Sequence, residues 1–166
     1  MSMSRDDRFA AMEAALSLSF GGEIKIGGNY VSVIRHDNQV YVSGQIPRVG
    51  DTVIATGRVG TEVSLEQARY AAKVCTMRAL ALLRHELGSL DRVSRILRIT
   101  VFVKCSEDFS QHSEVADGAS ELLHSVLGDA GIPTRTSVGV YQLPKNAPVE
   151  IDLIAAVDGC TDASPP

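Results

Sequence analysis

The residues best suited to chemistry stand close to the C-terminus, in the stretch from Thr134 to Val157. This stretch carries one arginine, Arg135, and two carboxylates, Glu150 and Asp152, within runs of alternating polar and apolar residues. A guanidinium can hold a carboxylate through two parallel hydrogen bonds, and a carboxylate can position a water molecule. Charges on strands that also contribute to a core need partners, because burying an unpaired charge is costly. These three side chains are therefore candidates for a binding or catalytic site.

A structural role is the alternative for the same charges. The two alternating runs predict a hairpin, with Arg135 on one face of the first strand and both carboxylates on one face of the second. Arg135 would then pair with Glu150 or Asp152 across the hairpin, which is an ordinary contact between strands. We interpret Glu150 as structural, whereas for Asp152 both roles stay open.

Other kinds of catalytic centre find no support in the sequence. The four histidines show no spacing typical of metal ligands, so we expect no metal site. No glycine-rich segment matches a phosphate-binding pattern. Cys75 falls on the apolar stripe of a predicted helix, and we expect a buried thiol rather than a nucleophile. His112 lies in the first turn of another predicted helix, and among the histidines it is the candidate for reaching a cleft and binding substrate.

The composition limits the classes of protein to which the chain can belong. Its 166 residues suggest one domain, with 45% hydrophobic and 22% charged residues. A net charge of −4 and an aromatic content of 5% without tryptophan argue against nucleic-acid binding. Three cysteines without paired spacing favour reduced thiols and a cytoplasmic location. No apolar run reaches membrane-spanning length, and the N-terminus does not resemble a signal peptide.

Three helices are predicted from their caps and apolar spacing. The first covers residues 4–18, and we interpret residues 1–28 as a helical extension that packs on a neighbour. The second begins with the capping box at Ser64 and ends at Gly88, and the third covers residues 109–127. Small apolar residues on the second helix would allow its close approach to a sheet.

Alternation and turn residues predict six strands, at residues 30–35, 39–43, 52–59 and 95–104 and in the two C-terminal runs. The order β-β-β-α-β-α-β-β implies one mixed six-stranded sheet in an α+β fold, with both internal helices on one face. The other face would stay open, which favours oligomerisation. Residues 29–158 would form the domain, and residues 159–166 a mobile tail.

Several short segments, taken in order, resemble one known family. They are Tyr30, the run Ser43-Gly-Gln-Ile-Pro47, the run Thr100-Val-Phe-Val103, Arg135, Leu143-Pro144, and the run Val149-Glu-Ile-Asp-Leu-Ile-Ala155. The set covers about residues 29–157 and is similar to the Rid family (RidA/YjgF, liver perchloric-acid-soluble protein, by an older name endoribonuclease L-PSP). The resemblance implies a chorismate-mutase-like fold and a homotrimer with clefts between the subunits.

The resemblance also implies an activity, the hydrolysis of enamines or imines such as 2-aminoacrylate to a keto acid and ammonia, without a metal or organic cofactor. An imine carbon is already electrophilic, so the protein needs mainly a positioned water, a proton donor and exclusion of solvent. By the family pattern Arg135 would bind the substrate carboxylate, Asp152 would help to place the water, and Tyr30 and Ser43 would line the cleft. Ser137, a further candidate for substrate binding, stands where typical members carry cysteine, and Asp152 is one methylene shorter than the usual glutamate.

Two other functions are kept beside the deaminase. A non-catalytic trimeric protein of the same fold would bind small carboxylates through Arg135 without turnover. An endoribonuclease is disfavoured by the acidic charge and the scarcity of aromatic residues. Turnover of imino acids that depends on Arg135 would distinguish the deaminase from both.

Overall fold

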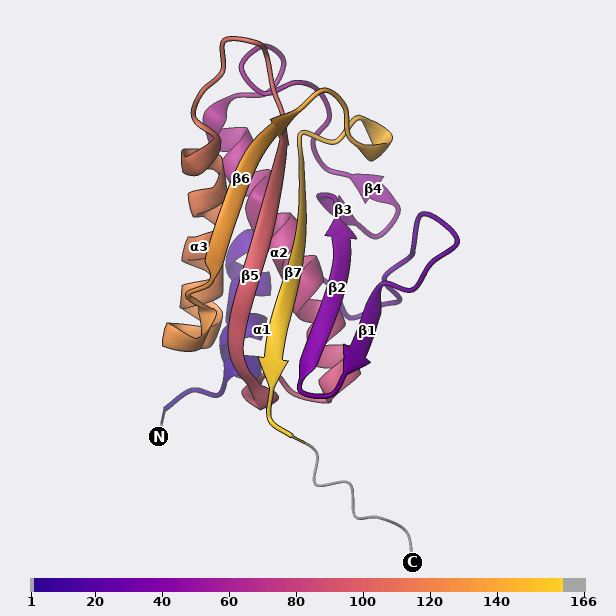
Figure 1. Cartoon of the computed structure of the whole chain (residues 1–166), viewed down its shortest axis with the longest axis vertical. Helices are drawn as coiled ribbons and strands as arrows, with labels where there is room; N and C mark the ends of the chain where they lie inside the picture. Colours follow the sequence, from indigo (N-terminus) through magenta and orange to yellow (C-terminus); the bar gives the residue numbers. More distant parts are fainter. Residues whose placement is uncertain (1, 160–166) are drawn as a thin grey trace, which may run out of the picture.

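Two long helices cover one face of a twisted β-sheet in this computed structural model, which describes residues 2–159 of the chain (Figure 1). The helices are α2 (Leu65–Leu87) and α3 (His112–Leu127), and a shorter helix, α1 (Arg5–Leu16), packs beside them. This arrangement confirms the predicted α+β class with both internal helices on one face. Of the predicted tail, residues 160–166 lie outside the described residues.

The main sheet has the strand order β1-β2-β7-β5-β6. The strands are β1 (Val33–His36), β2 (Gln39–Gln45), β5 (Val93–Lys104), β6 (Thr134–Val140) and β7 (Val149–Val157). Strand β7 is antiparallel to both β2 and β5, whereas β6 is parallel to β5, so the sheet is mixed. Because β5 lies between β6 and β7, the two C-terminal runs do not form the predicted hairpin. Alternation fixes the face that a side chain takes, but not the strand that lies beside it.

The segment after β2 does not add a sixth strand to this sheet. Strands β3 (Arg48–Val49) and β4 (Thr52–Val53) pair with each other as a separate two-stranded sheet. Gly50 turns the chain between them at a φ of 58°, a conformation that suits a residue without a Cβ. The prediction of six strands in one sheet is therefore corrected to five.

The predicted capping box at the start of α2 and the predicted glycine stop at its end are both confirmed. Gln67 donates its backbone N–H to the Ser64 hydroxyl at 3.2 Å, and its side chain accepts from the Ser64 N–H at 2.9 Å. Gly88 ends the helix in the left-handed region. Helix α1, predicted to pack on a neighbour, lies on its own chain, where Phe9 is fully buried and the Arg84 guanidinium stands 4.4 Å from the centre of its ring. The division of the chain at residue 28 stays a prediction.

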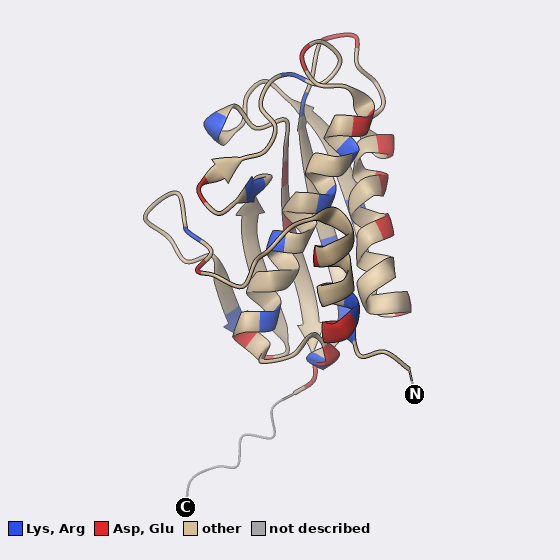
Figure 2. Ribbon diagram, turned by 180° about the vertical axis from the view of Figure 1, so that it is seen from behind, with Lys and Arg blue, Asp and Glu red and all other residues tan. Residues whose placement is uncertain are grey.

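Charge divides between the two helices that cover the sheet. Acidic residues line α3 and basic residues line α2, as Figure 2 shows from the helical side. Arg69 and Lys73 of α2 both reach Glu121 of α3, at 2.6 Å and 3.8 Å. Beneath them the buried side chains of α2, α3 and the sheet form one continuous core. Among residues 2–159, none of the helices combines the length and the apolar character that a membrane span requires.

Gly118→Ala is expected to lower the free energy of unfolding by about 1–3 kcal/mol, the usual cost of overfilling a packed interior. A Cβ at this position of α3 would stand 2.5 Å from the backbone oxygen of Arg69 on α2, so the two helices would have to separate. Urea denaturation measures the change. Ser125→Ala on an exposed part of α3 is the matched control, and equal stability of the two variants would contradict the close contact.

Candidate functional site

A β-bulge near the end of β2 shapes the candidate site. Val42 pairs with Leu153 and Gln45 pairs with Ile151, so two residues of β2, Ser43 and Gly44, stand against one of β7. The extra residue reverses the alternation, because Val42 is buried on the helical side and so is Gln45, three positions later. The bulge thus turns the Gln45 side chain toward the helices and leaves Gly44 on the open face.

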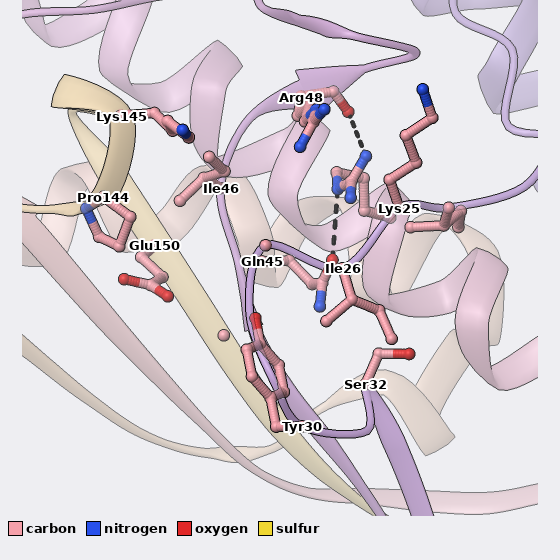
Figure 3. Close-up of a pocket in the computed structure, with 14 residues that line it drawn as sticks. Lys25, Ile26, Tyr30, Ser32, Gln45, Ile46, Arg48, Pro144, Lys145 and Glu150 are labelled. Carbon is pink, nitrogen blue, oxygen red and sulfur yellow. Dashed lines mark hydrogen bonds between the residues drawn. The ribbon is translucent and has the colours of Figure 1, made fainter.

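The Tyr30 pocket lies where the bulge opens the sheet, and its volume is about 210 Å³. Gln45 and Arg78 of α2 contribute from the helical side, and Tyr30 comes from the segment that precedes β1. Glu150 of β7 and Lys145 of the 3₁₀ turn η3 (Pro144–Asn146) also line the pocket. Figure 3 shows Tyr30, Gln45 and Glu150 around this space. Arg78 donates hydrogen bonds to the Gln45 side chain and to the Arg48 carbonyl.

Glu150 is the acidic side chain of this pocket. Its carboxylate lies against Gly44, where any Cβ would collide with it, so the glycine of the bulge makes room for the acid. Within residues 2–159 it has no hydrogen bond and no cation within ion-pair distance. Burial, and secondarily the charge of Asp152 on the same face, raises the pKa of Glu150 above the usual 4.5. A half-buried carboxylate that takes up a proton readily is suited to general acid–base work.

Ser43 and Asp152 lie in a second hollow, on the open face of the sheet. Its volume is about 370 Å³, and Arg98, Thr100 and Tyr41 also line it. Asp152 stands opposite Thr100 of β5 and is the residue of β7 that faces the bulge. The predicted pairing of Tyr30 with Ser43 in one cavity is therefore not seen within a single chain, because the bulge separates the two hollows.

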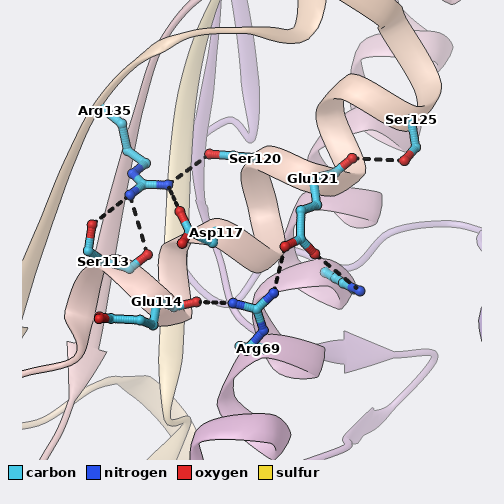
Figure 4. A network of polar contacts seen from close by, with 9 residues as sticks. Arg69, Ser113, Glu114, Asp117, Ser120, Glu121, Ser125 and Arg135 are labelled. Carbon is cyan, nitrogen blue, oxygen red and sulfur yellow. Dashed lines mark hydrogen bonds and ion pairs between the residues drawn. The ribbon is translucent and has the colours of Figure 1, made fainter.

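Arg135 projects to the helical side of β6, as its pairing with the buried Ile99 requires. Its Nη1 donates to Asp117 at 2.8 Å and to the Ser120 hydroxyl at 2.9 Å, and its Nη2 donates to the Ser113 hydroxyl at 2.8 Å (Figure 4). A fourth bond reaches the Ser113 carbonyl at 3.3 Å. The structural ion pair of Arg135 is thus made with α3, and neither Glu150 nor Asp152 is its partner.

Two other predicted residues lie near Arg135. Ser137 pairs with the buried Val101 and so shares the helical side of β6. The Nε2 atom of His112 is 3.3 Å from the Cys105 sulfur, and a Cβ at Gly139 would collide with both side chains. Burial raises the pKa of the Cys105 thiol, which keeps it protonated and argues against a thiolate nucleophile. Cys75, expected to be buried, is fully enclosed.

The predicted site residues therefore fall into three groups within one chain. Arg135, Ser137 and His112 lie at edge strand β6, Tyr30 lies in its pocket beyond β2, and Ser43 and Asp152 lie in the second hollow.

For the Tyr30 pocket the sequence interpretation missed Gln45 and Arg78, and it assigned Glu150 a structural role. The signal for Gln45 and Glu150 was Gly44, a glycine inside a strand, which indicates a bulge. No group of three or more potential metal ligands occurs among residues 2–159.

Comparison with known proteins gives the chain its family. The profile of the family described as Endoribonuclease L-PSP matches residues 21–157. Protein TCP17 of Trypanosoma cruzi is 35% identical over 159 residues, which cover 95% of this chain and 99% of that protein. A 2-iminobutanoate/2-iminopropanoate deaminase of Dermatophagoides farinae is 28% identical over 132 residues, covering 79% and 88%.

A solved structure extends the similarity to the fold. The protein Atu1372 of Agrobacterium tumefaciens, described as having unknown function, superposes with a TM-score of 0.81 at 34% identity, covering 93% of this chain and 92% of that one. Structures of other members of the family share the same mixed sheet, which is consistent with the chorismate-mutase-like fold. The chain therefore belongs to the endoribonuclease L-PSP family, the RidA/YjgF group that its ordered motifs resemble.

Proposed function

We propose that the protein is an enamine/imine deaminase that hydrolyses small imino acids to keto acids and ammonia. The observation that carries the proposal is Glu150, a carboxylate without a cationic partner and with a raised pKa in a pocket that also holds Tyr30 and basic side chains. The kinship with a 2-iminobutanoate/2-iminopropanoate deaminase supports the same reaction class. The free thiols of Cys75 and Cys105 fit the proposed cytoplasmic location.

In the proposed reaction Glu150 acts first as a base. With the imine in its protonated form, Glu150 takes a proton from water while the oxygen attacks the C=N carbon, and a neutral carbinolamine forms. The protonated Glu150 then gives that proton to nitrogen. The C–N bond breaks, ammonia leaves, and Glu150 accepts the hydroxyl proton as the carbonyl forms, then passes it to the released ammonia. Asp152, two residues away on the same face, helps this cycle by raising the pKa of Glu150. The acid–base group and the predicted water-placing carboxylate would thus act as a pair.

We propose that the substrate carboxylate is bound by Arg135 of a second copy of the chain, in a homotrimer. Arg135 lies on the edge strand β6, whereas the Tyr30 pocket lies beyond β2, so one chain cannot supply both to one substrate. The Asp117 side chain that holds Arg135 is 49% exposed. A substrate carboxylate can replace it with little change in charge pairing. Exposed apolar side chains on the open face, Val31, Ile34 and Tyr41, support association between copies.

The proposal is tested by ammonia release from imines generated in situ by an amino-acid oxidase. Purified protein is expected to accelerate the release from 2-iminobutanoate over the rate in buffer and over heat-denatured protein. Ammonia and keto acid should appear in equal amounts. Carboxylate binding without acceleration on any of several imino acids would support instead a non-catalytic binding protein of this fold.

A further inference from the structure

Arg78 is a buried cation without an acidic partner. Its side chain reaches from α2 into the Tyr30 pocket, and the residue is only 4% exposed. Its Nε donates to the Gln45 side chain at 3.3 Å, and its Nη1 donates to the Arg48 carbonyl at 2.7 Å. No carboxylate of residues 2–159 lies within ion-pair distance of its guanidinium. A buried charge that only neutral groups contact is costly, so an anion bound beside Arg78 would offset that cost.

The surroundings of Arg78 leave its charge uncompensated. Burial lowers the pKa of the Arg78 guanidinium, but arginine stays protonated in proteins. Two other cations of the lining, Lys25 and Arg48, are already paired with Asp51, at 2.6 Å and 3.5 Å. Lys145 adds a further positive charge from η3. The pocket therefore has an excess of positive charge in a protein whose net charge is −4.

One nitrogen of the guanidinium remains available for a ligand. The Nη2 atom of Arg78 makes no hydrogen bond within residues 2–159. Among residues 2–159, every fully buried side-chain nitrogen or oxygen has a hydrogen-bond partner. Because Nη2 has no partner, it is not fully buried, and it has access to the space of the pocket that Arg78 lines. An anion there would receive a charge-assisted hydrogen bond, which is stronger than a neutral one.

We propose that Arg78 forms an anion subsite of the Tyr30 pocket that binds the side-chain carboxylate of a small dicarboxylic imino acid. The inference rests on the proposed function, which assigns the first carboxylate to Arg135 of a second copy. In one chain Arg135 lies on edge strand β6, whereas Arg78 contacts Gln45 of β2, with β7 and β5 between these strands, so a single carboxylate that satisfies Arg135 leaves Arg78 unpaired. A second anionic group on the same ligand would pair with the Arg78 guanidinium. The volume of about 210 Å³ restricts the ligand to a short acid.

Substrate preference tests the subsite in the intact protein. Imines generated by oxidation of glutamate or aspartate are compared with 2-iminobutanoate, and kcat/KM is expected to be at least ~10-fold higher for the dicarboxylic imines. Arg78→Met should remove this preference, with kcat/KM lowered at least ~10-fold more for the dicarboxylic imines than for 2-iminobutanoate. Lys73→Met, which removes a cation from the α3-facing side of the same helix, is the matched control and should keep the preference. Equal losses on both substrate types, or no loss, would overturn the second-carboxylate assignment.

A binding measurement separates this inference from the proposed function, because it needs no turnover. Calorimetry with 2-oxoglutarate and 2-oxobutanoate should show tighter binding of the dicarboxylate to wild type, and Arg78→Met should bind both acids alike. Circular dichroism shows whether the Met variant folds. If it does not, the subsite is tested on wild type alone, by the rise in Tm that each of the two acids causes. A larger rise in Tm with 2-oxoglutarate supports the subsite, and equal rises overturn it. Failure to hydrolyse any imine, together with dicarboxylate selectivity, would refute the deaminase alone.

Discussion

Glu150→Gln is expected to lower kcat for imine hydrolysis by about 10²–10⁴-fold, the usual contribution of a general acid–base group. Glutamine keeps the shape that fits against Gly44 in the bulge, but it cannot take a proton from water. In wild type the rate should rise with pH through the raised pKa of Glu150, so the acid limb of the profile lies above pH 4.5, the usual value for glutamate. Steady-state rates between pH 4 and 8 measure both effects.

The neighbouring carboxylate provides the control for this variant. Asp152→Asn removes a charge that raises the pKa of Glu150, so the acid limb should move to lower pH while the maximal rate is kept. If Asp152→Asn abolishes hydrolysis and Glu150→Gln does not, the water-placing role belongs to Asp152, as the family resemblance first suggested.

Glu150→Gln is also expected to change the stability of the fold, in a direction that the raised pKa of Glu150 sets. The folded pKa of Glu150 lies above its unfolded value, so the folded state holds the proton more tightly. The stability from this group is present below the unfolded pKa and is lost as pH rises through the folded pKa. Glu150→Gln should therefore gain stability relative to wild type as pH rises from 4 toward 8, measured by urea denaturation. A constant difference across that range would contradict the raised pKa.

Arg135→Ala is expected to lower kcat/KM by about 10²-fold, mostly through KM, because it removes charge-assisted hydrogen bonds to the substrate worth roughly 3 kcal/mol. The arginine also ties β6 to Ser113, Asp117 and Ser120 of α3, so part of the effect could come from a disturbed fold. The melting temperature of the variant and its KM for 2-iminobutanoate, measured side by side, report these two contributions.

A second variant separates binding from structure at Arg135. Asp117→Asn removes the charge of the intrachain partner but leaves the arginine in place. A substrate carboxylate would then meet less competition, so KM should stay equal or fall, although Tm falls slightly. A rise of KM in Asp117→Asn equal to that in Arg135→Ala would show that the ion pair is purely structural.

Much of the fold could be predicted because its signals are local. The capping box at Ser64, the stop at Gly88 and the alternation along Val149–Val157 depend only on nearby residues, and the structure reproduces each of them. Strand pairing was not predictable in the same way. Nothing in the alternation of β6 or β7 indicates that β5 lies between them, because a partner strand distant in sequence leaves no mark on the pattern.

The site shows the same division between local and non-local information. Arg135, Tyr30 and Ser43 stand out by residue type and by their family pattern, yet the three side chains lie in different places of one chain. Arg78 gave no signal, because a single cation on an apolar helix has the same appearance in sequence whether it reaches a pocket or solvent. The choice between Glu150 and Asp152 depended on the bulge at Gly44, which shifts the space available to each carboxylate.

Mixing of two impaired variants tests most directly the central claim, that each site combines Glu150 of one copy with Arg135 of another. Glu150→Gln and Arg135→Ala chains are co-expressed with different tags, the mixed oligomers are purified through both, and rates are compared at substrate concentrations below the wild-type KM, where both parents are strongly impaired. A mixed trimeric ring holds two chains of one kind and one of the other, so about one third of its sites combine an intact Glu150 with an intact Arg135 from the neighbouring chain. Imine hydrolysis is expected to return toward that fraction of the wild-type rate. Mixed oligomers no more active than either parent would contradict it.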